Sequence, residues 1–167
     1  TDEIIAKLTE WSLADKKITP LKALQGIIWN EGYKNGELKG HVYPDVAPML
    51  EKWNKEGRKA GVFSSGSIAA QKLIFGYSES GDLTPFFSAY FDTTTGGKRE
   101  TETYSKISSA LTISPEHILF LSDIVEELIA AKAAGMQTIQ LVREGNTPNW
   151  DKIVANFEEV DQLINAN

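Results

Sequence analysis

Apolar residues recur with helical spacing over the first 40 residues. They lie three and four positions apart, which places them on one face of an amphipathic helix. The first such face contains Ile4, Ile5, Leu8, Trp11 and Leu13, and the second contains Leu21, Leu24, Ile27 and Ile28. Thr19-Pro20 has the composition of a helix start. We therefore predict two helices that end near Gly36, followed by a hinge at residues 40–44.

From residue 46 onward, short apolar runs alternate with helical patterns. The runs are residues 60–63, 89–91, 118–121 and 138–142. Strands that alternate with helices form βαβ crossovers, and therefore a parallel sheet covered by helices on both faces. This pattern predicts an α/β fold in which a helical unit, residues 1–40, precedes an α/β core, residues 41–167.

Composition and charge exclude several classes of function. The 17 Lys+Arg against 23 Asp+Glu give a net charge of −6, which disfavours general binding to nucleic acid or to an anionic membrane. The chain has no cysteine, so a disulfide scaffold, a thiolate metal site and a cysteine nucleophile are excluded. No apolar run approaches the roughly 18 residues of a membrane span. We expect a cytoplasmic protein with neither nucleic acid nor membrane as its partner.

Polar residues follow three of the predicted strands, at the edge where parallel sheets bind ligands. Ser64-Ser65-Gly66-Ser67 offers hydroxyl and N–H groups suited to an anion, although an ordinary helix cap has the same composition. Asp123 could hold Mg²⁺ or cap a helix. Asp92 precedes three threonines, so we expect it to cap a turn.

Two further groups of charged residues lie between or after these strands. Lys98 follows two glycines, which permit a close backbone approach, and a lysine can neutralise a phosphate as a point charge. Most loop lysines are simply solvated. Glu126 and Glu127 lie near a predicted helix N-terminus, where acidic residues are favoured, and we expect at least one of them on the solvated surface.

The order of these motifs resembles that of the haloacid dehalogenase superfamily. Longer segments are similar to its enolase-phosphatase (acireductone synthase) family of methionine salvage, over about residues 23–146. These segments are residues 23–29, 43–46, 64–67, 70–73, 75–78, 90–93 and 118–123. The resemblance implies a Rossmann-like parallel sheet with a small helical cap at residues 1–40. It also implies an Mg²⁺-dependent reaction that enolises and hydrolyses a phosphorylated small molecule, a methylthio-substituted diketopentyl phosphate, to an acireductone.

The same resemblance implies roles for individual residues. Ser64 and Ser65 would bind the substrate phosphate, and Asp123 would ligate Mg²⁺. Lys98 would bind the phosphate and offset charge in the phosphoryl-transfer transition state. The cap would close over the site and exclude water. His41 is a candidate acid–base group for the enolisation, although a hinge or packing role is favoured.

One motif of the superfamily is absent from these 167 residues. It is the Asp-x-(Asp/Glu)-Gly-Thr run on the central strand, whose first aspartate is the nucleophile and a metal ligand. Without that carboxylate there is no aspartyl-phosphate route, so we expect the chain alone to be inactive. We also expect the missing strand to come from an N-terminal segment in cis or from another chain. A phosphatase for another small phosphomonoester, and an inactive homologue that only binds a phosphorylated metabolite or a partner, stay open as alternatives.

Overall fold

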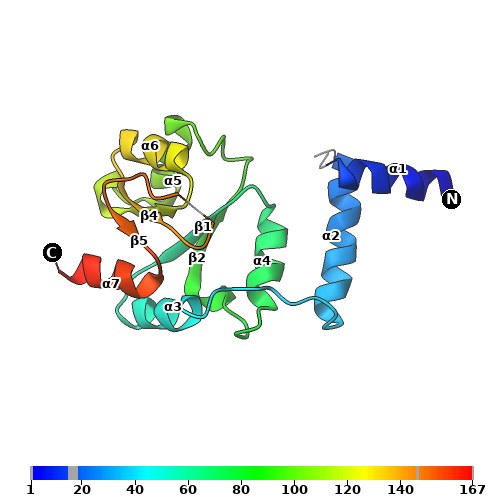
Figure 1. Cartoon of the computed structure of the whole chain (residues 1–167), viewed down its shortest axis with the longest axis horizontal. Coiled ribbons are helices and arrows are strands. Elements are labelled where there is room, and N and C mark those ends of the chain that lie inside the picture. The colour runs from blue at the N-terminus through cyan, green and yellow to red at the C-terminus, as the bar shows by residue number, and fades with distance from the viewer. Residues whose placement is uncertain (1, 15–18, 146, 167) are drawn as a thin grey trace.

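Two N-terminal helices stand apart from the strands in the computed structural model (Figure 1). The structure describes residues 2–14, 19–145 and 147–166. Thr1, the first residue of the chain, and Asn146, where the family resemblance ends, lie outside the described residues. Helix α1 spans Asp2–Leu13 and helix α2 spans Thr19–Lys34. Both helices were predicted, but much of their apolar surface is exposed. Ile4, Ile27 and Ile28 are more than half exposed, whereas Leu21 is buried.

Within the described residues, five parallel strands form two sheets. Strand β1 (Ala60–Phe63) pairs with β2 (Phe87–Phe91). Strand β3 (Leu119–Ser122) pairs with β4 (Gln137–Leu141), which also pairs with the short β5 (Ile153–Val154). No hydrogen-bonded ladder joins the two sheets within the described part of the chain. The parallel pairing confirms the α/β class predicted from the alternating pattern.

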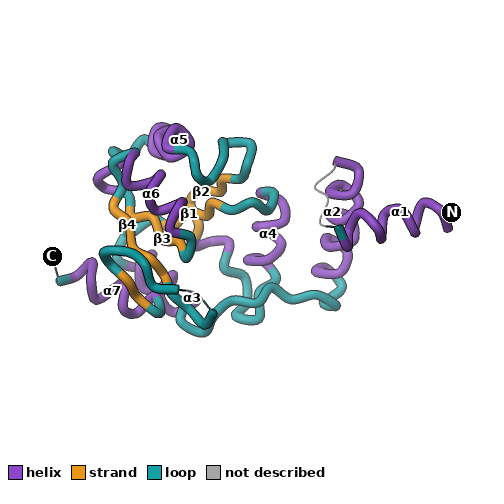
Figure 2. The backbone as a smooth tube through the Cα atoms, turned by 45° about the horizontal axis from the view of Figure 1, so that its top comes forward, coloured by secondary structure: helices purple, strands orange, loops and turns teal. Residues whose placement is uncertain are grey.

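Helices cover both faces of these strands (Figures 1 and 2). Helices α5 (Thr101–Leu111) and α6 (Val125–Ala133) contribute to one apolar cluster, and α3 (Val46–Lys55) and α7 (Phe157–Asn165) contribute to the other. In β3, Phe120 packs into the first cluster while Leu119 and Leu121 pack into the second. This alternation is the two-residue period of a strand that is covered on both sides.

Side chains from the helices bridge the two sheets. The ring of Tyr104 is fully buried, with its centroid 5.8 Å from that of Phe63 on β1 and 4.9 Å from that of Phe120 on β3. On the opposite face, α3 contacts both β1 and α7, and its Trp53 packs into the cluster that contains Leu121 of β3. Strands β1 and β3 therefore lie in one layer, under the same helices, without bonding to each other.

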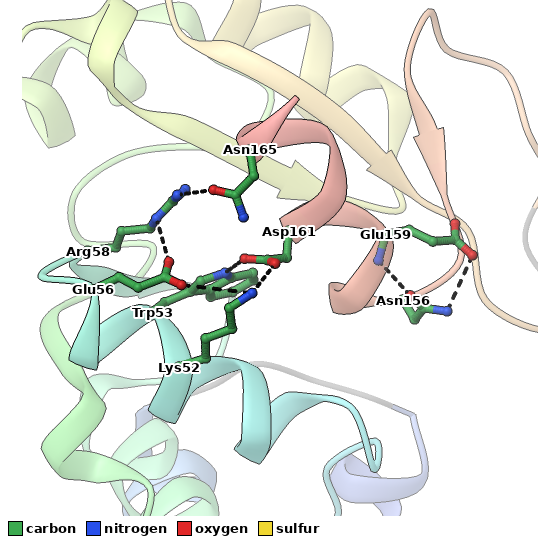
Figure 3. A network of polar contacts seen from close by, with 8 residues as sticks. All are labelled: Lys52, Trp53, Glu56, Arg58, Asn156, Glu159, Asp161 and Asn165. Atoms are coloured by element: carbon green, nitrogen blue, oxygen red, sulfur yellow. Dashed lines mark hydrogen bonds and ion pairs between the residues drawn. The ribbon is translucent and has the colours of Figure 1, made fainter. Parts of the chain in front are cut away.

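A polar network fastens α3 to α7 (Figure 3). Asp161 accepts hydrogen bonds from the Lys52 ammonium and, at 2.8 Å, from the Trp53 indole N–H. The bond from Lys52 holds the pKa of the Asp161 carboxyl below its ordinary value. Asn156 caps α7 by accepting from the Glu159 N–H at 2.9 Å. Helix α7 and strand β5 were not predicted from the sequence.

The segment between α2 and α3 is attached to the core at two points. Gly40 donates its N–H to Tyr77 O at 2.8 Å and accepts from the Glu79 N–H at 2.9 Å. Only glycine fits here, because a Cβ at this position would overlap the carbonyl oxygen of Ile74. At the second point, Asp45 Oδ2 accepts from Arg143 at 2.7 Å and from the Phe157 N–H at 2.8 Å.

Helix α4 (Ile68–Gly76) lies between β2 and α2. Two three-residue 3₁₀ turns, Thr84–Phe86 and Pro115–His117, precede β2 and β3. None of the described helices is long and apolar enough to cross a membrane.

Candidate functional site

The serine loop, residues 64–67, follows β1 and leads directly into α4. Ser67 is the N-cap of α4, since its Oγ accepts from the Ala70 N–H at 3.2 Å. Ser64 is half-buried and Ser65 is exposed. The Ser64 Oγ accepts from the Gly66 N–H at 3.2 Å and from the Gln71 side-chain amide at 3.0 Å. Because Ser67 provides the cap, the hydroxyl groups of Ser64 and Ser65 are not needed to start the helix.

Lys98 reaches the ends of β1 and β3. Its ammonium lies 2.7 Å from Glu127 Oε1 and 5.9 Å from the centroid of the Phe63 ring. The Lys98 and Glu127 side chains are 25% and 9% exposed, so Lys98 is not the solvated loop residue that the simplest reading of the sequence favours. The Tyr104 hydroxyl donates to the Lys98 carbonyl oxygen at 2.6 Å and thereby fixes the backbone of the loop.

Glu127 connects this lysine to β3. Its second oxygen, Oε2, accepts from the Ser122 hydroxyl at 2.9 Å, and the Ser122 Oγ accepts from the Ile124 N–H at 3.1 Å. Burial, together with the negative charge of Glu127, raises the pKa of Tyr104. Of the two adjacent acids, Glu126 is exposed as expected, and Glu127 is buried.

Asp123 is exposed at the carboxyl end of β3. It precedes Ile124, the N-cap residue of α6. Its carbonyl oxygen accepts from the Gln140 side chain at 3.2 Å. The same glutamine donates to Thr147 O at 3.0 Å and accepts from the Asn149 N–H at 2.8 Å. The backbone of Asp123 is therefore held against the loop that follows β4.

Asp92 and His41 each contact a neighbouring segment of the chain. Asp92 Oδ1 accepts from the Thr94 N–H at 2.9 Å, and its Oδ2 accepts from the Ile68 N–H at 3.2 Å, which confirms the predicted capped turn. His41 Nδ1 lies 3.1 Å from Glu79 Oε2, and both side chains are more than half exposed. This contact is at the junction with the N-terminal helices.

The described residues do not make a complete metal site. No group of three or more His, Cys, Asp or Glu residues that could hold a metal ion occurs within residues 2–14, 19–145 and 147–166. Mg²⁺ requires near-octahedral oxygen coordination, so the predicted role of Asp123 as a ligand needs further oxygen ligands.

A groove of about 560 Å³ separates α2 from α4. It is lined by Gly26, Ile27, Asn30, Ala69, Lys72, Leu73 and Tyr77. The groove thus lies between the N-terminal helices and the helix that starts at the serine loop.

Comparison with known proteins identifies the family. Residues 6–135 match the hydrolase family described as haloacid dehalogenase-like hydrolase. The enolase-phosphatase E1 of Pseudomonas fluorescens is 52% identical over 160 residues, which cover 96% of this chain and 70% of that protein. The enolase-phosphatase E1 of Picosynechococcus sp. is 56% identical over 143 residues, which cover 86% of this chain and 63% of that protein. The chain belongs to the enolase-phosphatase E1 family of haloacid dehalogenase-like hydrolases.

Solved structures agree with this family assignment. The UTR4 protein of Saccharomyces cerevisiae superposes with a TM-score of 0.84 at 34% identity, over 94% of this chain and 74% of that chain. A phosphatase of the haloacid dehalogenase type from Thermococcus onnurineus has a TM-score of 0.72 at 20% identity, over 92% and 68% of the two chains. The second likeness shows a shared fold only.

In this member of the enolase-phosphatase family, the fold brings together most of the residues singled out in the sequence. The loops that carry Ser64, Lys98 and Asp123 meet at the carboxyl ends of β1 and β3, and Glu127 is the residue that ties Lys98 to β3. Gln71 and Gln140 were missed. Their only signal in the sequence is a polar residue inside an otherwise apolar pattern.

Proposed function

We propose that the protein is an enolase-phosphatase of methionine salvage. In this reaction a methylthio-substituted diketopentyl phosphate is enolised and its phosphate ester is hydrolysed, which yields an acireductone and phosphate. The observation that carries the proposal is the convergence of three loops at the carboxyl ends of β1 and β3, with the Lys98 ammonium held 2.7 Å from a buried carboxylate. The relatives named enolase-phosphatase E1 support the choice of substrate.

Ser64, Ser65 and Lys98 form the phosphate-binding part of the site in this proposal. The two serine hydroxyls donate hydrogen bonds to phosphate oxygens, and the Lys98 ammonium offsets the charge that develops during phosphoryl transfer. Glu127 holds the ammonium at the sheet edge. Since the whole chain carries a net charge of −6, this local positive charge is what attracts an anionic substrate.

Asp123 is one oxygen ligand for the Mg²⁺ ion in this proposal. When bound, the ion would supply positive charge that balances the phosphate, and Asp123 would need further oxygen ligands beside it. Carboxylate oxygens together with phosphate oxygens are the usual protein sites for Mg²⁺. An exposed carboxylate at the end of β3 fits that use.

A further strand completes the sheet between β1 and β3 in this proposal. Both strands lie in one layer, bridged by Tyr104 on one face, yet their facing edges are not paired within the described part of the chain. Each unpaired backbone group that is buried costs about 1–3 kcal/mol. A strand that carries an Asp-x-(Asp/Glu)-Gly-Thr run, supplied in cis or by another chain, would satisfy these edges and provide the nucleophile.

The two N-terminal helices are the cap in this proposal, residues 1–40, and residues 41–167 are the catalytic core. Helix α2 borders the groove next to α4, and Gly40 anchors the connecting segment. Exclusion of water by such a cap favours phosphoryl transfer to the enzyme over side reactions. We place the reaction in the cytoplasm, because a phosphorylated intermediate does not cross membranes unaided.

The test measures Mg²⁺-dependent phosphate release in two preparations. One is the chain alone, and the other is the chain with a segment that carries the Asp-x-(Asp/Glu)-Gly-Thr strand, fused or added as a peptide. We expect activity only in the second, and loss of that activity in Lys98→Ala but not in Lys106→Ala, whose lysine pairs with Glu102 on the surface. Equal activity of Lys98→Ala would refute the role of Lys98. Preference for another phosphomonoester in a substrate panel would refute the assignment of the substrate.

A further inference from the structure

A buried glutamine, Gln71 on α4, lies behind the serine loop. It is 3% exposed. Its side-chain nitrogen lies 3.0 Å from Ser64 Oγ, 2.9 Å from Gly66 O and 2.8 Å from Phe91 O. The two carbonyl oxygens determine how the amide is oriented, because the opposite orientation would place its oxygen against both of them. Gln71 therefore connects the end of β1, the serine loop and the end of β2.

Two N–H donors face the Ser64 hydroxyl oxygen, which has two lone pairs and one proton. The Ser64 Oγ receives the Gly66 N–H at 3.2 Å and lies 3.0 Å from the Gln71 nitrogen. The two protons of that nitrogen are shared among Ser64 Oγ and two backbone carbonyl oxygens. The hydroxyl proton must point away from both donors, and the acceptor near it, Gly66 O, lies 3.5 Å away. That distance exceeds a good O–H···O bond of about 2.5–3.0 Å, so the hydroxyl can donate to an incoming anion.

Gln71 also contacts two backbone carbonyl oxygens beside Ser64. Its nitrogen lies 2.9 Å from Gly66 O and 2.8 Å from Phe91 O, and Phe91 O receives the Ser64 N–H as well, at 3.3 Å. The amide therefore stays on the inner side of Ser64, so the hydroxyl proton is directed outward. Meanwhile the Gln71 Oε1 is buried without a hydrogen-bond partner among the described residues. A buried acceptor without a partner destabilises a fold, so stability is a poor explanation for a glutamine at this position.

We propose that Gln71 is a positioning residue of the phosphate site, which commits the Ser64 hydroxyl to donate toward the substrate phosphate. Gln71 itself does not touch the substrate. The proposal rests on the proposed function, because it takes the anion at Ser64 to be the substrate phosphate. It predicts that Gln71 acts on phosphate affinity only through Ser64.

The test is a double-mutant cycle on phosphate affinity. Binding of inorganic phosphate to the chain supplemented with the Asp-x-(Asp/Glu)-Gly-Thr strand is measured by titration calorimetry for the wild type, Gln71→Met, Ser64→Ala and the double variant. We expect each single variant to weaken binding by about fivefold to tenfold, the size of one hydrogen bond, and the double variant to bind no more weakly than Ser64→Ala. Gln137→Met is the matched control, since this exposed glutamine donates to Glu116 O far along the chain from the loop.

The outcomes separate this proposal from the proposed function. If Ser64→Ala weakens phosphate binding while Gln71→Met does not, or if the two effects multiply, the positioning role is wrong and the phosphate site stands. If the wild type binds no phosphate, or Ser64→Ala has no effect, the phosphate site itself is wrong and the positioning role falls with it. A structural role alone would lower the melting temperature without this coupling.

A second variant gives a pH-dependent readout of the bond between residue 71 and Ser64. Gln71→Glu keeps the size of the side chain, but an ionised carboxylate accepts the Ser64 proton instead of donating to its oxygen. We expect phosphate binding to weaken above the pKa of that carboxyl, and Ser64→Ala to add no further loss in this background. A further loss on adding Ser64→Ala would overturn the positioning role.

Discussion

Replacing Asp45 tests how the N-terminal helices are held to the core. Asp45 is 8% exposed, and one of its oxygens accepts from both Arg143 and the Phe157 N–H. Breaking a buried ion pair by removing one partner costs about 3–5 kcal/mol. The Arg143 guanidinium keeps its stacking on Tyr43, 3.8 Å from the ring centroid, so we expect the low end, about 3 kcal/mol, for Asp45→Ala.

That loss is measurable in a protein of this size. Each kcal/mol shifts the melting temperature by about 2–4 °C, so Asp45→Ala should melt about 6–12 °C lower in differential scanning calorimetry. Asp45→Asn keeps one acceptor oxygen and should lose less than half as much. Asp151→Ala, which breaks the exposed pair with Lys132, should cost less than about 1 kcal/mol. If Asp45→Ala lowered the free energy of unfolding no more than Asp151→Ala, the bonds of Asp45 to Arg143 and Phe157 would not stabilise the fold.

The pH dependence of stability, compared between the wild type and Asp45→Asn, tests the electrostatic contribution of the Asp45 carboxylate. Burial works to raise the pKa of Asp45, but the hydrogen bonds from Arg143 and the Phe157 N–H outweigh it and leave this pKa below its ordinary value of 3.8. A lowered pKa means that the carboxylate stabilises the fold above the ordinary value, and that this contribution is lost as the pH falls through the folded-state pKa. The wild type should therefore lose its advantage over Asp45→Asn only in acid, below about pH 4, in urea titrations. A constant difference between pH 7 and pH 3 would contradict this account.

Three more predictions concern the site, the junction and α7. In the chain supplemented with the Asp-x-(Asp/Glu)-Gly-Thr strand, Glu127→Gln should reduce phosphate release about tenfold to a hundredfold, because Lys98 loses the charge that orients it. Glu126→Gln, at the exposed neighbouring position, should match the wild type in the same assay. Gly40→Ala should lower the free energy of unfolding by about 1–3 kcal/mol or more in urea titrations, because the added methyl group overlaps the carbonyl oxygen of Ile74. An unchanged free energy of unfolding would refute that packing. Asp161→Asn should lower the melting temperature at pH 7 and have less effect in acid, since the pKa of Asp161 is lowered by its bond with Lys52 and the contribution disappears as this carboxylate is protonated.

The alternating periods of the sequence were sufficient to predict the architecture. Helical spacing before residue 40 predicted α1 and α2, although much of their apolar surface is exposed. Short apolar runs after residue 40 predicted the strands β1 to β4, because strands covered by helices on both faces are apolar on both faces. The order of the serine, lysine and aspartate motifs along those elements then predicted one site at the carboxyl ends of the strands. Strand β5 and helix α7 were missed, since a two-residue strand has no period of its own.

Tertiary structure alone decided which polar residues cooperate. Glu126 and Glu127 are adjacent in the chain, and only the packing of α6 exposes the first and buries the second beside Lys98. Gln71 and Gln140 contact backbone groups as many as 20 residues away in the chain. Such contacts produce no periodic pattern in the sequence, because a hydrogen bond between distant segments depends on where the folded backbone places those segments. The sequence thus determined the elements and the order of the motifs, and the folded backbone determined which side chains hold those motifs in place.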